Sequence, residues 1–130
     1  MRNLALVFVG AGLGGVGRYL LTVAVQTTFV PRTGSNFPFA TLVVNVTGCL
    51  LIGVLGGALI RAGRDADRPL TLFLLVGILG GYTTFSSFGR ETFVLIEERQ
   101  LGLAALYVAG SNTLGVLAVY VGSMLAPRAA

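Results

Sequence analysis

The sequence predicts an all-α integral membrane protein with four transmembrane helices, the third of which is broken near its middle. Composition gives the class, because 55% of the 130 residues are hydrophobic and only 11% are charged. A soluble domain usually has about a quarter of its residues charged, so this chain lacks the polar side chains to cover a surface in water. A mean hydropathy of +0.87 agrees with a bilayer environment.

The apolar residues gather in four runs, and each run is long enough to cross a membrane. The runs cover about residues 4–29, 37–60, 70–96 and 101–126. A helix needs about 20 residues to cross about 30 Å of hydrocarbon. The connections between the runs are short and polar, which predicts an up-down-up-down bundle that occupies residues 1–130 as a single domain.

The charged residues indicate membrane flanks. All nine cations are arginine. In a soluble protein, an isoelectric point of about 10 would suggest binding to nucleic acid. The arginines separate the apolar runs and form no patch with aromatic residues, so membrane flanks explain them better than a nucleic-acid partner. Five arginines lie on the side of the membrane that carries the termini: Arg2, Arg61, Arg64, Arg68 and Arg128. Arg32 and Arg99 lie on the other side. This difference favours termini in the cytoplasm.

The first run is interpreted as a retained span, because it is too long for a signal peptide and no small-residue cleavage site follows it. Gly10, Gly12 and Gly15 match the spacing of a dinucleotide-binding loop, but that loop needs an acidic residue about 20 positions later, and the first carboxylate in the chain is Asp65. The sequence therefore does not support a dinucleotide site.

Arg18 lies well inside the first run. A charge at mid-bilayer costs roughly 2.5 to 3.5 kcal/mol on insertion scales, so Arg18 faces a wet cavity or a partner, or else extends to the interface.

Glycine pairs in three runs predict close packing of helix backbones. A GxxxG spacing lets two helices approach closely in a membrane without implying any reaction. The pairs are Gly10/Gly14, Gly53/Gly57 and Gly77/Gly81.

Two runs each carry a polar face. In the second run Thr41, Asn45 and Gly48 are spaced four and three residues apart, so they share one face of a helix. An Asn in hydrocarbon needs a hydrogen-bond partner, which leaves two interpretations, a contact between helices or a donor that lines a pore. In the fourth run Tyr107 and Ser111 are four residues apart. Polar faces on two different spans favour a shared aqueous path.

The third apolar run is interrupted by glycine, hydroxyl and charged residues in the segment GILGGYTTFSSFGRE, residues 77–91. Gly80 and Gly81 each weaken a helix by about 1 kcal/mol, and the hydroxyls of Thr83 and Thr84 compete for backbone hydrogen bonds. A break in the helix is therefore predicted. Non-helical backbone at membrane depth is tolerated where it is buried in protein or lines a wet cavity. Freed carbonyls there can ligate a cation and free N–H groups attract an anion, so the break is a candidate ion site.

Two phenylalanines follow the break, and they lie three residues apart. Phe85 and Phe88 share one face of the helix that resumes there. The edge of an aromatic ring is positive and favours an anion weakly, whereas plain packing is the ordinary role of a phenylalanine. The spacing alone leaves both interpretations open.

Four segments together resemble the Fluc (CrcB) family of fluoride channels over essentially the whole chain. They are GGVGRY in the first run, ATLVVNVTG at the start of the second, GGYTTFSSF in the third and Y-x-x-x-S-N in the fourth. The motif of the third run is the most specific. The departures are small, since Ala40 stands where the family commonly has glycine and Ser87 where threonine is usual.

The resemblance implies a subunit that pairs with an antiparallel copy of itself, as a dual-topology homodimer, or with a paralogous subunit of opposite orientation. It implies passive fluoride export through two pores in the inner (cytoplasmic) membrane, and no enzymatic activity. It places Arg18 in an aqueous vestibule, and a structural sodium ion at the dimer axis between backbone carbonyls of Gly80 and Thr83. The fluoride pathway that it implies uses Thr41, Asn45, Phe85, Phe88, Glu91, Tyr107 and Ser111.

The alternative is a small multidrug-type exporter coupled to protons, which also forms compact antiparallel dimers. That activity needs a carboxylate within the membrane, and Glu91 is the one internal candidate in the sequence. The preference for fluoride over other small anions rests on the family resemblance.

Overall fold

The computed structural model describes residues 1–29, 36–63 and 69–127, and these residues form helices and connections without any strand. Four helical segments are long and apolar enough to cross a membrane, which confirms the predicted fold class. The segments are α1 (Arg2–Thr28), α3 (Phe39–Arg61), a composite third span over Pro69–Glu97, and α7 (Leu101–Leu125). The protein is thus a multi-pass membrane protein.

The composite third span consists of four consecutive helical pieces. These are α4 (Pro69–Thr71), the π-helix η1 (Leu72–Leu79), α5 (Gly80–Tyr82) and α6 (Phe85–Glu97). Thr83 and Thr84 between α5 and α6 are extended, with ψ angles of 158° and 111°. The predicted break is confirmed, and it lies just after the Gly80-Gly81 pair rather than at it.

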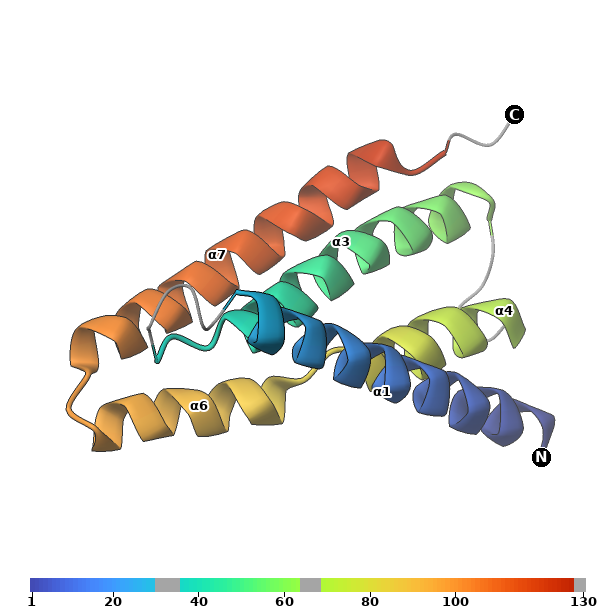
Figure 1. Ribbon diagram of the computed structural model, residues 1–130. Helices are drawn as coiled ribbons and strands as arrows, with labels where there is room; N and C mark the ends of the chain where they lie inside the picture. Colours follow the sequence, from blue (N-terminus) through green and yellow to red (C-terminus); the bar gives the residue numbers. More distant parts are fainter. Residues whose placement is uncertain (30–35, 64–68, 128–130) are drawn as a thin grey trace.

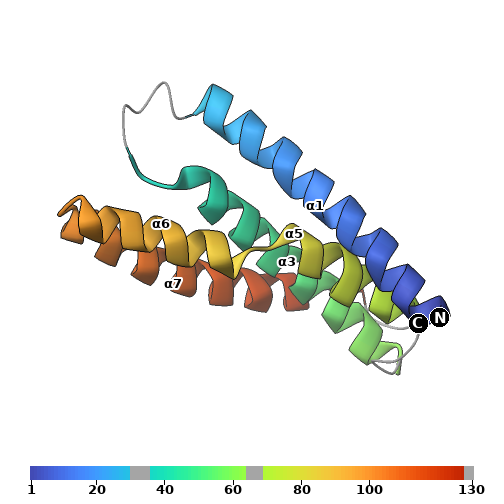
Figure 2. The same cartoon turned by 90° about the horizontal axis from the view of Figure 1, so that it is seen from below.

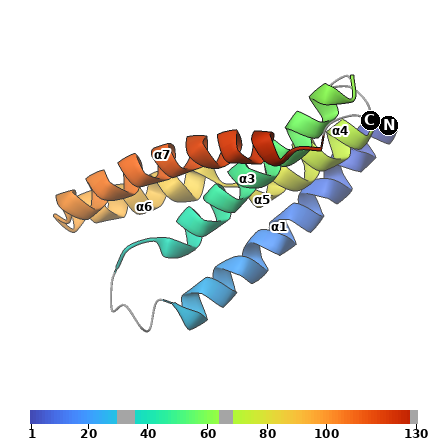
Figure 3. The same cartoon turned by 90° about the horizontal axis from the view of Figure 1, so that it is seen from above.

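The four spans alternate in direction and pack as two pairs. α3 runs along α7, and α1 packs on η1 and α5 (Figure 1). α6 lies beside α7 and away from α1, as the two turned views show (Figures 2 and 3). The start of α1 and the end of α7 therefore lie at the same end of the molecule.

Glycines bring the backbones of α1 and the third span into direct contact, as the GxxxG spacing predicts. A Cβ added to Gly10 would lie 2.9 Å from the Cα of Gly77, and one added to Gly14 would overlap the carbonyl oxygen of Ile78. A Cβ on Gly53 of α3 would likewise overlap the carbonyl oxygen of Val119 in α7. These positions exclude any side chain larger than hydrogen unless the helices separate.

The outer surface of the bundle is apolar. Among the described residues, Phe8, Ile60 and Val116 expose 81%, 79% and 71% of their surface. In each candidate span only 11% to 22% of the most apolar window is buried inside the chain. A surface of this kind suits contact with lipid or with another protein, and does not suit water.

Candidate functional site

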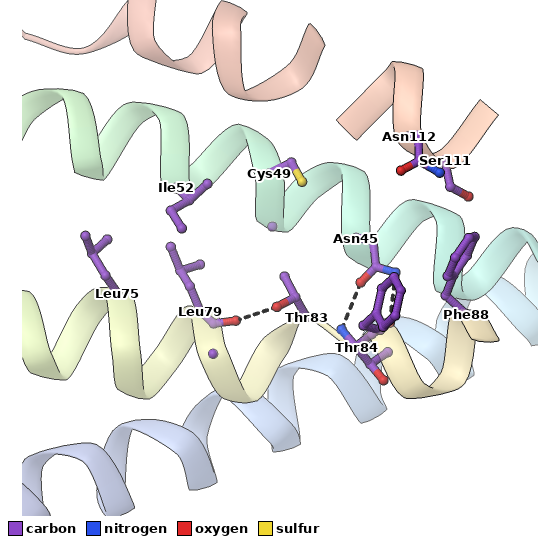
Figure 4. A pocket seen from close by; sticks show the side chains of 13 residues that line it. Asn45, Cys49, Ile52, Leu75, Leu79, Thr83, Thr84, Phe88, Ser111 and Asn112 are labelled. Carbon is purple, nitrogen blue, oxygen red and sulfur yellow. Dashed lines mark hydrogen bonds between the residues drawn. The ribbon is translucent and has the colours of Figure 1, made fainter. Parts of the chain in front are cut away.

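A groove of about 360 Å³ opens beside the break in the third span. Its walls come from α3, from the third span on both sides of the break, and from the middle of α7 (Figure 4). Leu75 and Ile52 lie toward one end of the groove, whereas Asn45, Phe88 and Ser111 lie toward the other. The groove therefore has an apolar end and an end that carries hydrogen-bonding groups.

Asn45 of α3 closes the break by binding the backbone of Thr84. Its Nδ2 donates to the Thr84 carbonyl at 3.0 Å, and the Thr84 N–H donates to its Oδ1 at 2.9 Å (Figure 4). Because the Thr84 N–H can only donate, the carboxamide oxygen must face it. Asn45 thus replaces two backbone hydrogen bonds that the helix lacks at the break, and one N–H of its amide group is left over.

The threonines at the break satisfy much of their own hydrogen bonding. The Thr83 hydroxyl donates to the Leu79 carbonyl at 3.0 Å, and the Thr84 hydroxyl accepts the Ser87 N–H at 3.2 Å, which caps the start of α6. This is the competition between hydroxyl and helix that the sequence predicts. The carbonyl oxygens of Gly80 and Thr83 accept no hydrogen bond from the described residues, and both residues line the groove.

Phe85 and Phe88 lie at the polar end of the groove, on the first turn of α6. Their ring centroids are 5.5 Å apart. Phe88 is half-buried and also lies 5.1 Å from the ring of Tyr107. Phe85 exposes 83% of its surface, although it lines the groove. Packing inside one chain therefore accounts for Phe88 but leaves Phe85 uncovered.

Ser111 of α7 carries a buried hydroxyl oxygen that has no hydrogen-bond partner in the described part of the chain. The same residue lines the groove near Asn45 and Phe88 (Figure 4). A buried polar atom without a partner is costly and is uncommon in native structures. The Ser111 hydroxyl is thus free to hydrogen-bond with water or with an ion in the groove.

A hydrogen-bonded cluster next to Phe88, called the Glu91 cluster below, consists of Thr41, Glu91 and Tyr107. The Thr41 hydroxyl donates to one carboxylate oxygen of Glu91 at 2.7 Å, and the Tyr107 hydroxyl donates to the other at 2.7 Å. Tyr107 is completely buried, and Thr41 is 6% exposed. Glu91 therefore joins α3, α6 and α7 through a carboxylate that is held within the membrane span.

Arg18 lies in the middle of α1, on the helix face that carries the buried residues Gly10, Gly14 and Val25. It is half-buried and has no hydrogen bond or ion pair with another described residue. It lines neither the groove nor the second cavity described below. Among the described residues, the charge of Arg18 thus has no partner.

A second cavity, of about 520 Å³, lies at the opposite end of the bundle from the start of α1. It is bounded by the end of α1, by residues 36–40 and by α6. Its polar lining residues are Gln26, Asn36, Arg90, Glu91 and Glu98. The sequence did not predict this cavity, because segments far apart in the chain form it.

The π-helix and two hydrogen-bonded contacts were likewise not predicted. The Tyr82 hydroxyl lies 2.7 Å from the Thr47 hydroxyl and so ties α5 to α3. Arg61 donates to the carbonyls of Ser123, at 2.9 Å, and Ala126, and so satisfies the end of α7. An aromatic hydroxyl beside the break was the one signal that pointed to the first contact. Nothing local to Arg61 pointed to the second.

The model of the family described as "CrcB-like protein, Camphor Resistance (CrcB)" matches residues 5–123. The chain belongs to the CrcB family. The match spans all four apolar helices, and so it includes every residue of the groove and of the Glu91 cluster.

Several curated CrcB relatives are similar to the chain over almost its full length. The protein of Methylobacterium sp. is 48% identical over 93% of this chain and 93% of its own length. The protein of Nitrobacter hamburgensis is 42% identical over 95% of each chain, and that of Caulobacter sp. is 41% identical over 98% of this chain and 97% of its own. The first and third are named fluoride-specific ion channel FluC, and the second fluoride-specific ion channel FluC 2.

Proposed function

We propose that the protein is a fluoride-selective ion channel that passively exports fluoride across the inner (cytoplasmic) membrane and so lowers cytoplasmic fluoride. One observation carries the proposal: relatives named fluoride-specific ion channels align with at least 93% of this chain at 41% to 48% identity. A channel changes no covalent bond, so the protein is not proposed as an enzyme. An inside-negative membrane potential drives an anion outward, so export needs no other source of energy.

The polar end of the groove supplies groups suited to a small anion. Fluoride has to exchange its hydration water for other donors, and these must hold it weakly enough to release it. The Ser111 hydroxyl has no partner among the described residues, and one N–H of the Asn45 amide is left over. Phe85 and Phe88 beside them offer ring edges, which carry partial positive charge. These four residues are the proposed first part of the pathway.

The Glu91 cluster is the proposed second part. Tyr107 contacts Phe88 and donates its hydroxyl to Glu91, as does Thr41. Both hydroxyls must turn from the carboxylate toward fluoride before they can help it pass. As the ion passes, each hydroxyl would donate to fluoride instead of to the Glu91 carboxylate, so it would keep a hydrogen-bond acceptor throughout. Arg18 lies on the buried face of α1 without a partner among the described residues, and its charge would attract anions into a wet vestibule.

The break also fits a structural sodium ion. The carbonyl oxygens of Gly80 and Thr83 accept no hydrogen bond from the described residues, and oxygen is the ligand that hard cations prefer. They lie at the C-terminal end of the continuous helix that η1 and α5 form, where the helix dipole is negative. This pair supplies two oxygen ligands, so we propose that a second, antiparallel subunit contributes the same pair at the dimer axis. Such a homodimer, or a pair with a paralogous subunit of opposite orientation, would contain two pores. The exposed Phe85 is consistent with a partner subunit.

Ion flux from liposomes tests the function. Vesicles that contain the purified protein and are loaded with fluoride and chloride should release fluoride rapidly and retain chloride. The variants Phe85→Ile and Asn45→Ala should lose fluoride release. If no fluoride leaves the wild-type vesicles, or if chloride leaves equally fast, the proposal is wrong. Replacing all sodium with N-methylglucamine should abolish the flux if the cation site is occupied by sodium.

The multidrug-type exporter is tested in the same vesicles by uptake of an organic cation against a proton gradient. That activity needs a carboxylate that alternately binds protons and substrate. Both carboxylate oxygens of Glu91 are already hydrogen-bonded to hydroxyl groups. We therefore expect no uptake.

A further inference from the structure

The second cavity offers a route for an anion between the Glu91 cluster and water, but its charge opposes an anion. We propose that Arg90 sets the rate at which anions cross this cavity, by offsetting the charges of Glu91 and Glu98. The inference rests on the proposed channel function. It adds a residue that controls rate at the mouth of the pathway.

The groove and the second cavity are joined by side chains in contact. Phe88 lines the groove, and its ring lies 5.1 Å from that of Tyr107. The Tyr107 hydroxyl donates to Glu91, which itself lines the second cavity. An anion that passes the aromatic residues therefore meets Glu91 and then this cavity. The cavity opens at the end of α6 and α1, where the membrane span ends.

Among the described residues, the cavity is lined by two carboxylates and one cation, so the loss of Arg90 would leave both negative charges without any opposite charge there. Glu91 and Glu98 both line it, and Arg90 is the single cation among its described lining residues. Glu98 also accepts a hydrogen bond from Gln100 at 2.8 Å, and that bond leaves its charge in place. Two carboxylates at the mouth of a low-dielectric channel repel an approaching anion.

Arg90 is placed to counter this repulsion over the whole cavity. It has no ion pair with another described residue, so its charge is not neutralised by one close carboxylate. It is exposed and lies next to Glu91 in the chain, at the start of the second turn of α6. A cation in such a mouth raises the local concentration of anions, and the effect weakens as salt shortens the Debye length.

Fluoride efflux at two ionic strengths tests the inference. Arg90→Gln is compared with Arg99→Gln, which removes an equally charged and exposed side chain that does not line the cavity. At about 10 mM salt the Debye length is about 30 Å, and at about 1 M it is about 3 Å. Potassium gluconate supplies the added salt, because a large organic anion does not enter the channel.

We expect Arg90→Gln to lower fluoride efflux roughly three- to ten-fold at low salt and less than two-fold at high salt. Arg99→Gln should stay within about two-fold of wild type at both, and Arg90→Lys should restore most of the rate because it restores the charge. Glu98→Gln should raise efflux at low salt, since it removes one repelling charge. A general loss of folded protein would not produce this opposite change.

Three results would overturn the inference. The first is an efflux rate for Arg90→Gln at low salt that equals the wild-type rate. The second is an equal loss of efflux in Arg99→Gln. The third is a loss in Arg90→Gln that does not depend on charge, because it persists at high salt and is not restored in Arg90→Lys. Failure of the channel function looks different, since the wild-type protein itself would then release no fluoride. Size-exclusion chromatography of each variant confirms that folded protein is being compared.

Discussion

At the scale of single residues, two polar side chains in the same groove differ in what they bind. Asn45 binds the Thr84 backbone through both its carboxamide oxygen and its nitrogen, whereas the Ser111 hydroxyl has no partner in the described part of the chain. The first side chain therefore contributes to the fold and lines the groove, while the second contributes only to the groove. Substitution of Asn45 therefore tests the stability of the fold, whereas substitution of Ser111 tests conduction.

We predict that Asn45→Ala lowers the free energy of unfolding by about 1 to 3 kcal/mol, because it leaves the N–H and carbonyl of Thr84 unsatisfied. Ser111→Ala should leave stability unchanged or slightly raised and should lower fluoride efflux, because it removes a buried hydroxyl without a partner. Thermal unfolding in detergent and efflux from liposomes measure the two effects separately.

Asn112→Ala is the matched control for Asn45→Ala. Its carboxamide also lines the groove, but it donates to the carbonyl of Val108 in its own helix and makes no hydrogen bond to the described residues at the break. Its removal should change stability by less than about 0.5 kcal/mol. If Asn45→Ala is as stable as wild type, Asn45 does not hold the break together. If Ser111→Ala conducts normally, the Ser111 hydroxyl does not contact the ion.

At the scale of helices, the contact between α1 and the third span depends on individual glycines. A Cβ on Gly14 would overlap the carbonyl oxygen of Ile78, whereas a Cβ on Gly12 would meet nothing within 4 Å. Two glycines of the same helix, two residues apart, therefore lie in opposite environments. Every other effect of replacing glycine by alanine is shared between them.

We predict that Gly14→Ala destabilises the protein by roughly 1 to 3 kcal/mol, since the added methyl forces α1 away from the π-helix. Gly12→Ala should be neutral or should stabilise by up to about 1 kcal/mol, because alanine favours a helix. Chemical unfolding in detergent micelles measures both. Equal stability of the two variants would show that the close contact near Ile78 is not present in the folded protein.

The sequence predicted these helices well, because apolar length and glycine spacing are local properties. It also predicted the break, since glycines and hydroxyls weaken a helix wherever they stand. The π-helix Leu72–Leu79 could not be predicted in the same way. Its residues are ordinary apolar ones, and the wider turns are found where the helix packs against the glycine face of α1.

For the site, the sequence supplied residue types and faces but not partners. An Asn in hydrocarbon needs a hydrogen bond, but only the structure shows that Thr84 provides it. Glu91 was placed on the polar path through family resemblance, and the structure adds that two hydroxyls from α3 and α7 hold its carboxylate. The role that we propose for Arg90 could not be predicted, because it depends on a cavity that α1, α6 and residues 36–40 form together.

At the scale of the whole molecule, one chain leaves its charged and aromatic groups incompletely covered. Arg18 has no partner among the described residues, Phe85 is 83% exposed, and the carbonyls of Gly80 and Thr83 accept no hydrogen bond there. All three features are consistent with a second subunit. The excess of arginines on the side of the termini is small, five against two, so it determines the orientation only weakly.

We predict that the chain inserts in both orientations in the same membrane. Ala62→Cys, at the end of α3, and Gly102→Cys, at the start of α7, lie at opposite ends of the bundle, and both positions are exposed. In a Cys49→Ser background, which removes the single native thiol, a membrane-impermeant thiol reagent added to intact cells should label about half of each variant. A single orientation would label one variant almost fully and leave the other unlabelled, and that result would contradict an antiparallel homodimer. Labelling after permeabilisation is the control, because both cysteines should then react completely.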